Sequence, residues 1–179
     1  MALRDPAPAP LATVQAFVNT LDLESGPERL PDAEALRGWL ANARLLDADA
    51  EVGPAEHERA IVLREALRDV LSGDEAAVAQ VNAAGERAGL RPLLQPDGRS
   101  ALEPVAGGVD GALGRLVAIV HGAVADGTWA HLKACERSVC RWAFYDHSKN
   151  HSGRWCDMDD CGAKEKSARA YRRRRARQA

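Results

Sequence analysis

Four cysteines are the residues of this sequence whose type and spacing point most directly to chemistry. All of them fall within 27 residues, and none occurs earlier in the chain: Cys135, Cys140, Cys156 and Cys161. Thiolates in two close pairs satisfy the tetrahedral, four-coordinate preference of structural zinc. A site closed by four thiolates leaves no position for a catalytic water. The cysteines therefore predict one structural zinc ion and argue against a zinc hydrolase.

Two other uses of these residues remain open from the sequence. The cysteines could form two disulfides, although a reducing cytoplasm disfavours such bonds. The histidines between the cysteine pairs, His147 and His151, could each replace a thiolate ligand. Because four cysteines suffice for the site, we expect both histidines on the surface of the module instead.

Aromatic residues also lie between the cysteine pairs. Trp142 and Phe144 precede the turn-forming residues 148–153, and Trp155 follows them, which predicts a β-hairpin within residues 142–155. The rings could stack on bases, but so small a module has little else to bury. We therefore expect them to form its core, separate from the core of the preceding residues.

The charge of the chain is distributed unevenly. Residues 1–130 hold 11 Lys/Arg and 20 Asp/Glu, whereas residues 131–179 hold 13 and 6. This asymmetry is typical of an appended module that binds nucleic acid or another anionic surface, although a solvated tail that is basic by chance would look the same. From Gly162 onward Ala, Lys and Arg predict a basic helix. The residues expected to contact nucleic acid, mostly at phosphates, are Lys149, Arg154, Lys164, Lys166, Arg169, Arg172, Arg173, Arg174 and Arg175.

The residues before this module, which must position it, are expected to form helices and one hairpin. Apolar residues recur at spacings of three and four, and capping residues mark the ends of each run. The expected helices are 11–23, 32–46, 54–71, 74–89 and 109–127. Pro96-Asp97-Gly98 predicts the turn of a β-hairpin within residues 90–105. The fold class is therefore α+β and mainly α.

We expect a disordered arm over residues 1–10, a helical domain over residues 11–130 and a zinc-binding hairpin-helix module over residues 131–179. No apolar run approaches the roughly 20 residues of a membrane-spanning helix, and the N-terminus lacks a secretory pattern, so we expect a soluble, cytoplasmic protein. Residues 1–130 hold no phosphate-binding loop, nucleophile elbow or zinc-protease motif, which argues against an enzyme.

The cysteine-rich segment resembles a known family. The string C-x4-C-x-W-x-F-Y-D-x-S-K-N-x-S-x-R-W-C-x-M-x-x-C-G, followed by a basic helix, is similar to the CGNR zinc finger of bacterial proteins over about residues 131–175. Such proteins carry an N-terminal ABATE domain, and FVNTLD at residues 17–22 with the following Trp39-Leu40 helix resembles its opening. The two resemblances together span nearly the whole chain.

The resemblance implies a stress-induced transcription regulator that binds DNA through its zinc finger and senses a small-molecule effector through its first domain. This chain departs from the family at Ala163-Lys164, where the family has Asn-Arg, and it therefore lacks the amide and the guanidinium for contacts at these positions. RNA binding has the same electrostatic signature. The alternative from another class is a zinc-stabilised adaptor, whose basic tail docks an acidic partner or the acidic domain of a second copy in a homodimer.

Overall fold

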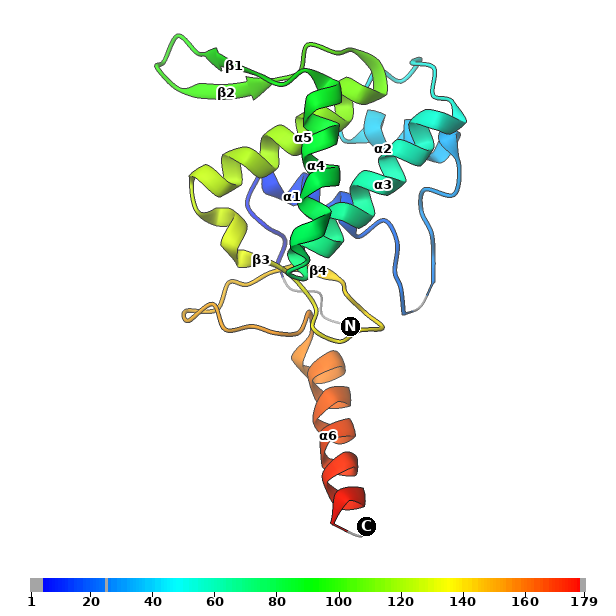
Figure 1. The fold of residues 1–179 in the computed structure, drawn as a ribbon, viewed down its shortest axis with the longest axis vertical. Helices are drawn as coiled ribbons and strands as arrows, with labels where there is room; N and C mark the ends of the chain where they lie inside the picture. The colour runs from blue at the N-terminus through cyan, green and yellow to red at the C-terminus, as the bar shows by residue number, and fades with distance from the viewer. Residues whose placement is uncertain (1–4, 25, 178–179) are drawn as a thin grey trace.

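The computed structural model describes residues 5–24 and 26–177, which form a helical body and a helix that projects from it (Figure 1). The body helices are α1 (Leu11–Val18), α2 (Ala33–Asn42), α3 (Pro54–Leu71), α4 (Val78–Ala88) and α5 (Gly108–Ala125). The strands are β1 (Arg91–Leu94), β2 (Ser100–Glu103), β3 (Leu132–Ala134) and β4 (Ala143–Tyr145). Shorter helical turns are η1 (Glu75–Ala77), η2 (Thr128–His131) and η3 (Met158–Gly162), and η3 leads into the projecting α6 (Ala163–Ala176). The fold class is thus α+β and mainly α, as the sequence predicts.

Two helix ends lie at the capping residues that the sequence predicts. The Asp32 carboxylate accepts a hydrogen bond from the Ala35 N–H at 2.8 Å. α4 ends at Gly89, whose φ of 61° lies in the left-handed region that favours glycine. Two helices are shorter than predicted, because α1 ends at residue 18 and α2 ends at residue 42.

Side-chain hydrogen bonds and a backbone turn account for these early ends. The Thr20 hydroxyl donates to the Phe17 carbonyl at 2.8 Å, and Arg68 donates to the Val18 carbonyl at 2.7 Å, so the last carbonyls of α1 are satisfied without further helix. After α2 the chain turns at Arg44, whose φ of 59° is incompatible with a right-handed helix.

The main core lies between the five body helices. Its largest fully buried apolar side chains are Phe17, Leu30, Leu36, Leu40, Leu63, Leu67, Leu113 and Leu116. α5 is long and apolar enough to cross a membrane by length and composition alone. However, its residues Leu113 and Leu116 are buried in this core, so α5 also packs as a core helix of the body.

The predicted hairpin of residues 90–105 is confirmed. β1 and β2 pair antiparallel, with Arg91 opposite Glu103 and Leu94 opposite Ser100. The hairpin joins two helices that cross closely: a Cβ on Gly114 of α5 would lie 2.3 Å from the Ala88 Cβ of α4. Glycine is therefore required at this crossing.

The predicted hairpin within residues 142–155 is wrong in its partner strand. β4 pairs antiparallel with β3, which precedes the first cysteine, and Ala134 lies opposite Ala143. Residues 146–155 form a loop instead, because the Asp146 carboxylate accepts hydrogen bonds from the N–H groups of Ser148 at 3.2 Å and Gly153 at 2.6 Å. Backbone donors held by a side chain are not available for a strand ladder.

β3 and β4 connect two cores. Leu132, Ala143 and Tyr145 pack with the helical core, whereas Phe144 packs with the four cysteines. The module therefore has a cluster of its own, as expected, and β4 lies between this cluster and the helical core. Successive residues of a strand point to opposite faces, and here each face of β4 meets a different cluster.

Of the arm predicted over residues 1–10, residues 1–4 lie outside the described residues. The remainder contacts both parts of the molecule. Ala7 is buried in the helical core, and its N–H donates to the Gln15 side chain at 2.7 Å. The Pro6 carbonyl lies 3.1 Å from Nε2 of His147 in the cysteine-rich module.

Candidate metal centre

The four cysteines converge where the body meets α6. Cys135 directly follows β3, Cys140 lies in the connection to β4, Cys156 precedes η3 and Cys161 lies within η3. All four side chains are buried, and their Sγ atoms lie within 4.8 Å of one another. The predicted metal-ligating residues therefore form one cluster.

The sulfur spacing fits a tetrahedral metal site. Sγ of Cys156 lies 3.6 Å from Sγ of Cys140 and 3.7 Å from Sγ of Cys161. Metal–sulfur bonds of about 2.3 Å at tetrahedral angles place ligands roughly 3.8 Å apart, whereas a disulfide bond measures about 2.05 Å. All four cysteines are free thiols. The geometry thus fits metal ligation and not the disulfide alternative.

The four thiols perturb one another's ionisation. Hydrogen bonds from Cys140 and Cys156 lower the pKa of Cys135. Hydrogen bonds to Cys135 and Cys140, together with burial, raise the pKa of Cys156. Thiolates this close repel one another, so all four ionise together only around a cation. The donor set is that of a soft divalent metal ion.

Aromatic rings enclose the cluster, as predicted. Phe144 is buried with the cysteines, and Trp142 and Trp155 pack against them while partly exposed. The Arg154 guanidinium lies 5.2 Å from the centroid of the Trp155 ring. The rings are thus the core of the module.

Neither histidine between the cysteine pairs joins the cluster. His147 packs on Tyr145 with ring centroids 4.8 Å apart, and His151 stacks on His131 with centroids 3.8 Å apart. Both His147 and His151 are exposed, so the expectation that they lie on the surface is confirmed.

Asp146 organises the loop between the cysteine pairs, although it is not among the predicted site residues. Its carboxylate is fully buried and accepts a hydrogen bond from Lys133 Nζ at 2.8 Å. Burial alone would raise the pKa of Asp146, but hydrogen bonds from Lys133, Ser148 and Gly153 outweigh it and hold the pKa below its usual value. A Cβ on Gly153 would lie 2.8 Å from this carboxylate. In the sequence, this role of Asp146 is indicated only by a glycine seven residues after the aspartate.

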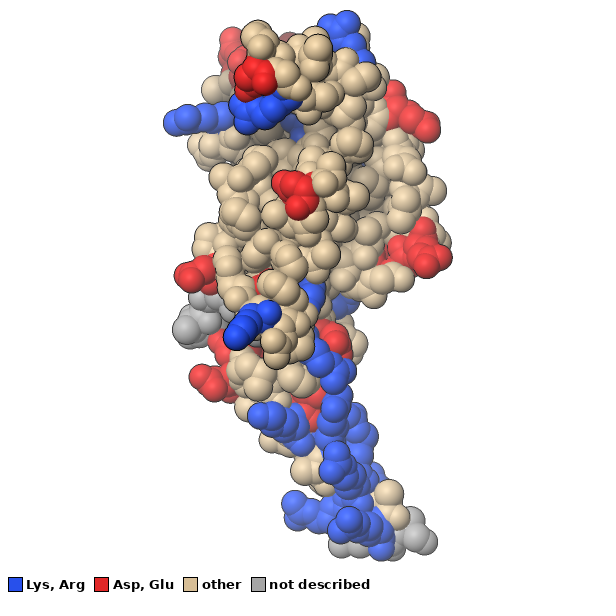
Figure 2. All heavy atoms as spheres, turned by 90° about the vertical axis from the view of Figure 1, so that its left-hand side faces the viewer, with Lys and Arg blue, Asp and Glu red and all other residues tan. Residues whose placement is uncertain are grey.

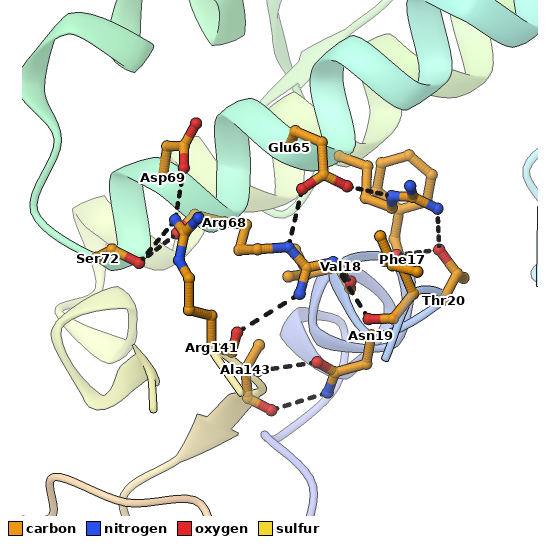
Figure 3. A network of polar contacts seen from close by, with 12 residues as sticks. Phe17, Val18, Asn19, Thr20, Glu65, Arg68, Asp69, Ser72, Arg141 and Ala143 are labelled. Atoms are coloured by element: carbon orange, nitrogen blue, oxygen red, sulfur yellow. Dashed lines mark hydrogen bonds and ion pairs between the residues drawn. The ribbon is translucent and has the colours of Figure 1, made fainter. Parts of the chain in front are cut away.

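The module docks on α1 through the side chain of Asn19 (Figure 3). Its Nδ2 donates to the Ala143 carbonyl at 2.8 Å, and its Oδ1 accepts from the Ala143 N–H at 2.8 Å. The amide therefore pairs with β4 as a neighbouring strand would. Beside it, Arg141 forms an ion pair with Asp69 at 2.5 Å near the end of α3.

Arg68 lies fully buried at the same junction (Figure 3). Its guanidinium donates to Glu65 at 3.0 Å, to the Val18 carbonyl at 2.7 Å and to the Arg141 carbonyl at 3.5 Å. A buried charge is stable only when it is paired and hydrogen-bonded. Arg68 thus ties α1, α3 and the residues before β4 into one network. Its only sequence signal is an arginine four residues after Arg64 on the buried side of α3.

The predicted nucleic-acid contacts divide into two groups. Four form ion pairs within the protein: Arg154 with Glu136, Lys164 with Glu24 and Asp160, and both Arg169 and Arg172 with Glu165. The other five are exposed and show no ion pair among the described residues: Lys149, Lys166, Arg173, Arg174 and Arg175. Arg177 is a further exposed cation after α6 that the prediction omits.

α6 gathers most of these cations along one projecting rod. Figure 2 shows that Lys and Arg crowd this end of the molecule, whereas acidic residues lie mainly over the body on the face in view. α6 contains no buried residue. Its cations without an ion pair among the described residues can therefore face an external anionic surface.

Comparison with protein-family models gives two matches. A model named ABATE, described as "Putative stress-induced transcription regulator", matches residues 11–132. The CGNR zinc finger model matches residues 131–175, which include the four cysteines and nearly all of α6. A search among curated proteins found no match.

Proposed function

The chain belongs to the ABATE family, whose model is described as "Putative stress-induced transcription regulator", and carries a CGNR zinc finger. From this premise we propose that it regulates transcription by binding DNA through α6. A structural zinc ion, bound by the four cysteines, holds the start of α6 against the body. The single observation that carries the proposal is a strongly cationic helix with no packing role of its own.

The donor set of the cluster supports zinc as the ion. Four buried sulfur atoms at tetrahedral spacing suit a soft divalent ion, whereas magnesium and calcium prefer oxygen ligands. A site closed by thiolates is structural and supplies folding free energy of about 10–16 kcal/mol in small zinc modules. No part of this assignment needs catalytic chemistry, so we propose that the protein is not an enzyme.

The shape and charge of α6 support DNA as the partner. A helix about 10–12 Å in diameter fits a major groove about 12 Å wide. The cations without ion pairs on α6, Lys166 and Arg173 to Arg175, are available for phosphates, and Lys149 extends the basic surface into the loop. Contacts of this kind position a protein on the duplex without reading its sequence. Access to the chromosome and reduced thiols are consistent with a cytoplasmic protein.

We propose that an effector of the first domain binds in a cavity of about 590 Å³ between the turn after α2 and the start of α5. Its lining includes Arg44, Asp47 and Arg115. Two guanidinium groups favour an anionic small molecule. Small carboxylates and phosphates should then raise the melting temperature of the parent protein more than that of an Arg44→Ala variant.

Fluorescence anisotropy with a random-sequence DNA duplex at several salt concentrations tests the proposed function. Binding through phosphates should weaken with salt at a log-log slope of about −0.9 per phosphate engaged. RNA of the same length, both double- and single-stranded, distinguishes a DNA-binding from an RNA-binding protein. If no nucleic acid is retained near physiological ionic strength, the proposal is wrong, and an adaptor that binds an acidic protein or a second copy of this chain takes its place.

A further inference from the structure

The projecting α6 has no buried residue that would fix its direction. Within the described parts of the chain, one hydrogen-bonded ion pair joins α6 to the first domain: Lys164 Nζ donates to Glu24 Oε1 at 3.0 Å. Lys164 also pairs with Asp160 at 2.7 Å. Asp160 lies in η3, one turn earlier, and therefore holds α6 only to its own support. Of these two ion pairs, the one with Glu24 is therefore the one that joins α6 to the body.

Glu24 also contacts the surroundings of the metal centre. It accepts a hydrogen bond through Oε2 from Arg137 Nη1 at 2.6 Å. The electrostatic interaction of Arg137 with Cys161 in turn raises the pKa of Arg137, as its hydrogen bond to Glu24 also does. The hydrogen bonds from Arg137 and Lys164 keep the pKa of Glu24 below its usual value, so this carboxylate is ionised at neutral pH. One carboxylate thus bridges the start of α6 and a neighbour of the metal centre.

The loop that carries Glu24 is held in turn by α3. Arg68 donates to the Leu21 carbonyl at 3.3 Å, and Arg64 forms an ion pair with Glu28 at 2.7 Å, so both ends of the loop are attached. The side chains of these two arginines are 0% and 3% exposed. Hydrogen bonds from nearly buried cations do not exchange readily with water. α3 therefore positions Glu24 relative to the helical core.

We propose that Glu24 is a positioning residue that fixes the direction of α6 relative to the first domain through Lys164. The proposal rests on the proposed function, because it concerns how the DNA-contacting helix is held and how a change in the first domain reaches it. It also assigns Lys164, which stands where the family has arginine, a role inside the protein in place of a DNA contact.

Pulsed dipolar spectroscopy on the full-length, zinc-loaded protein measures the direction of α6. Spin labels on non-canonical amino acids at Val62 of α3 and Tyr171 of α6 leave the cysteines untouched, and both sites are exposed, at 49% and 60%. The parent should give a narrow distance distribution. Glu24→Gln should broaden the distribution, because a neutral amide holds an ammonium group less strongly than a carboxylate does.

Three further variants serve as controls for charge and for Lys164. Glu58→Gln removes the same charge from an exposed carboxylate of α3 that shows no ion pair among the described residues, and it should leave the distribution narrow. Lys164→Arg keeps the charge and should also leave it narrow, whereas Lys164→Met should reproduce the effect of Glu24→Gln. Zinc content equal to that of the parent shows that the module of each variant is folded.

The distance measurements decide the proposal. A distribution for Glu24→Gln as narrow as that of the parent would overturn it, and so would equal broadening in Glu58→Gln. DNA binding provides a second readout: Glu24→Gln should bind DNA up to roughly fivefold more weakly than Glu58→Gln, because a loosely held helix must be ordered on binding. A parent protein that binds no DNA would refute the proposed function, yet the distance test of Glu24 would still stand.

Discussion

At the scale of single residues, the module is organised by side chains that are buried and satisfied. The cysteines share one site, and Asp146 closes the loop between them through hydrogen bonds to Lys133 and two backbone N–H groups. Such groups are costly to remove, because the partner left behind stays buried without a hydrogen bond. Single substitutions at this site should therefore have large effects.

Metal analysis tests the identity of the ion. We expect freshly purified, reduced protein to contain one zinc per chain, with X-ray absorption reporting only sulfur neighbours at about 2.3 Å. Cys140→Ser should lower the retained zinc after dialysis against a chelator, because an alcohol is a poor ligand for this ion. Substoichiometric zinc in the parent, or oxygen or nitrogen neighbours, would contradict the all-thiolate site.

Asp146→Asn tests the buried carboxylate. An amide cannot neutralise Lys133, so the free energy of unfolding at pH 7 should fall by about 1.5–3 kcal/mol, the value of hydrogen bonds to a charged group. The folded-state pKa of Asp146 lies below its unfolded value of about 3.9, so its contribution is fully present above that value and is lost as the pH falls toward the folded pKa. Denaturant unfolding of parent and variant should therefore give the same difference at pH 7 and pH 5. A difference that shrinks between these values would show that the carboxylate titrates in this range.

At the scale of elements, the cations of α6 differ in their pairing. Glu165 accepts contacts from Arg169 at 3.1 Å and Arg172 at 2.9 Å, which compensates part of their charge. Lys166 and Arg173 show no ion pair among the described residues. We expect the cations without an ion pair to contribute most to DNA binding.

Paired double variants test which cations of α6 bind DNA. Replacing both Arg173 and Arg174 with Ala should reduce the salt slope of DNA binding by up to roughly 2, because two phosphate contacts are lost. Replacing both Arg169 and Arg172 removes the same formal charge, but the slope should change less, because these arginines already interact with Glu165. Anisotropy titrations of both variants on one random duplex give the comparison. Equal losses would mean that α6 binds through its total charge, whether or not a cation is paired within the protein.

At the scale of the whole molecule, the zinc module and the helical body share structure. Leu132, Ala143 and Tyr145 belong to the helical core, although they lie within or beside the cysteine-rich segment. Asn19 and Arg68 of the body satisfy the backbone around β4. Loss of the metal should therefore reach the body.

Cys156→Ala tests this coupling. Disruption of the module should withdraw β3 from the helical core and lower the free energy of unfolding of the body by about 1.5–3 kcal/mol, the value of burying one large apolar side chain such as Leu132. Thermal unfolding followed by the helical circular dichroism signal measures the effect. A body that melts at the same temperature in parent and variant would show that the two parts fold independently after all.

Several features of this protein were predictable because they depend on neighbours in the sequence. Helix faces follow from apolar spacing, the β1–β2 hairpin follows from Pro96-Asp97-Gly98, and the metal cluster follows from the grouping of the cysteines. The partner strand of β4 was not predictable in this way. The segment that connects β3 to β4 carries Cys135 and Cys140. It is longer than the two-residue turns whose sequences predict a hairpin.

The sequence by itself thus determined the helices, the mainly α class and the four cysteines that cluster, because periodicity and cysteine spacing are local properties of the chain. Only the tertiary structure decided the roles of Arg68, Asp146 and Glu24. A charged side chain becomes structural when the fold buries it or brings it to a partner far along the chain, as between Glu24 and Lys164. Only the structure likewise distinguishes the arginines of α6 that pair with a carboxylate from those that are exposed to solvent. In the sequence the two kinds of arginine look identical.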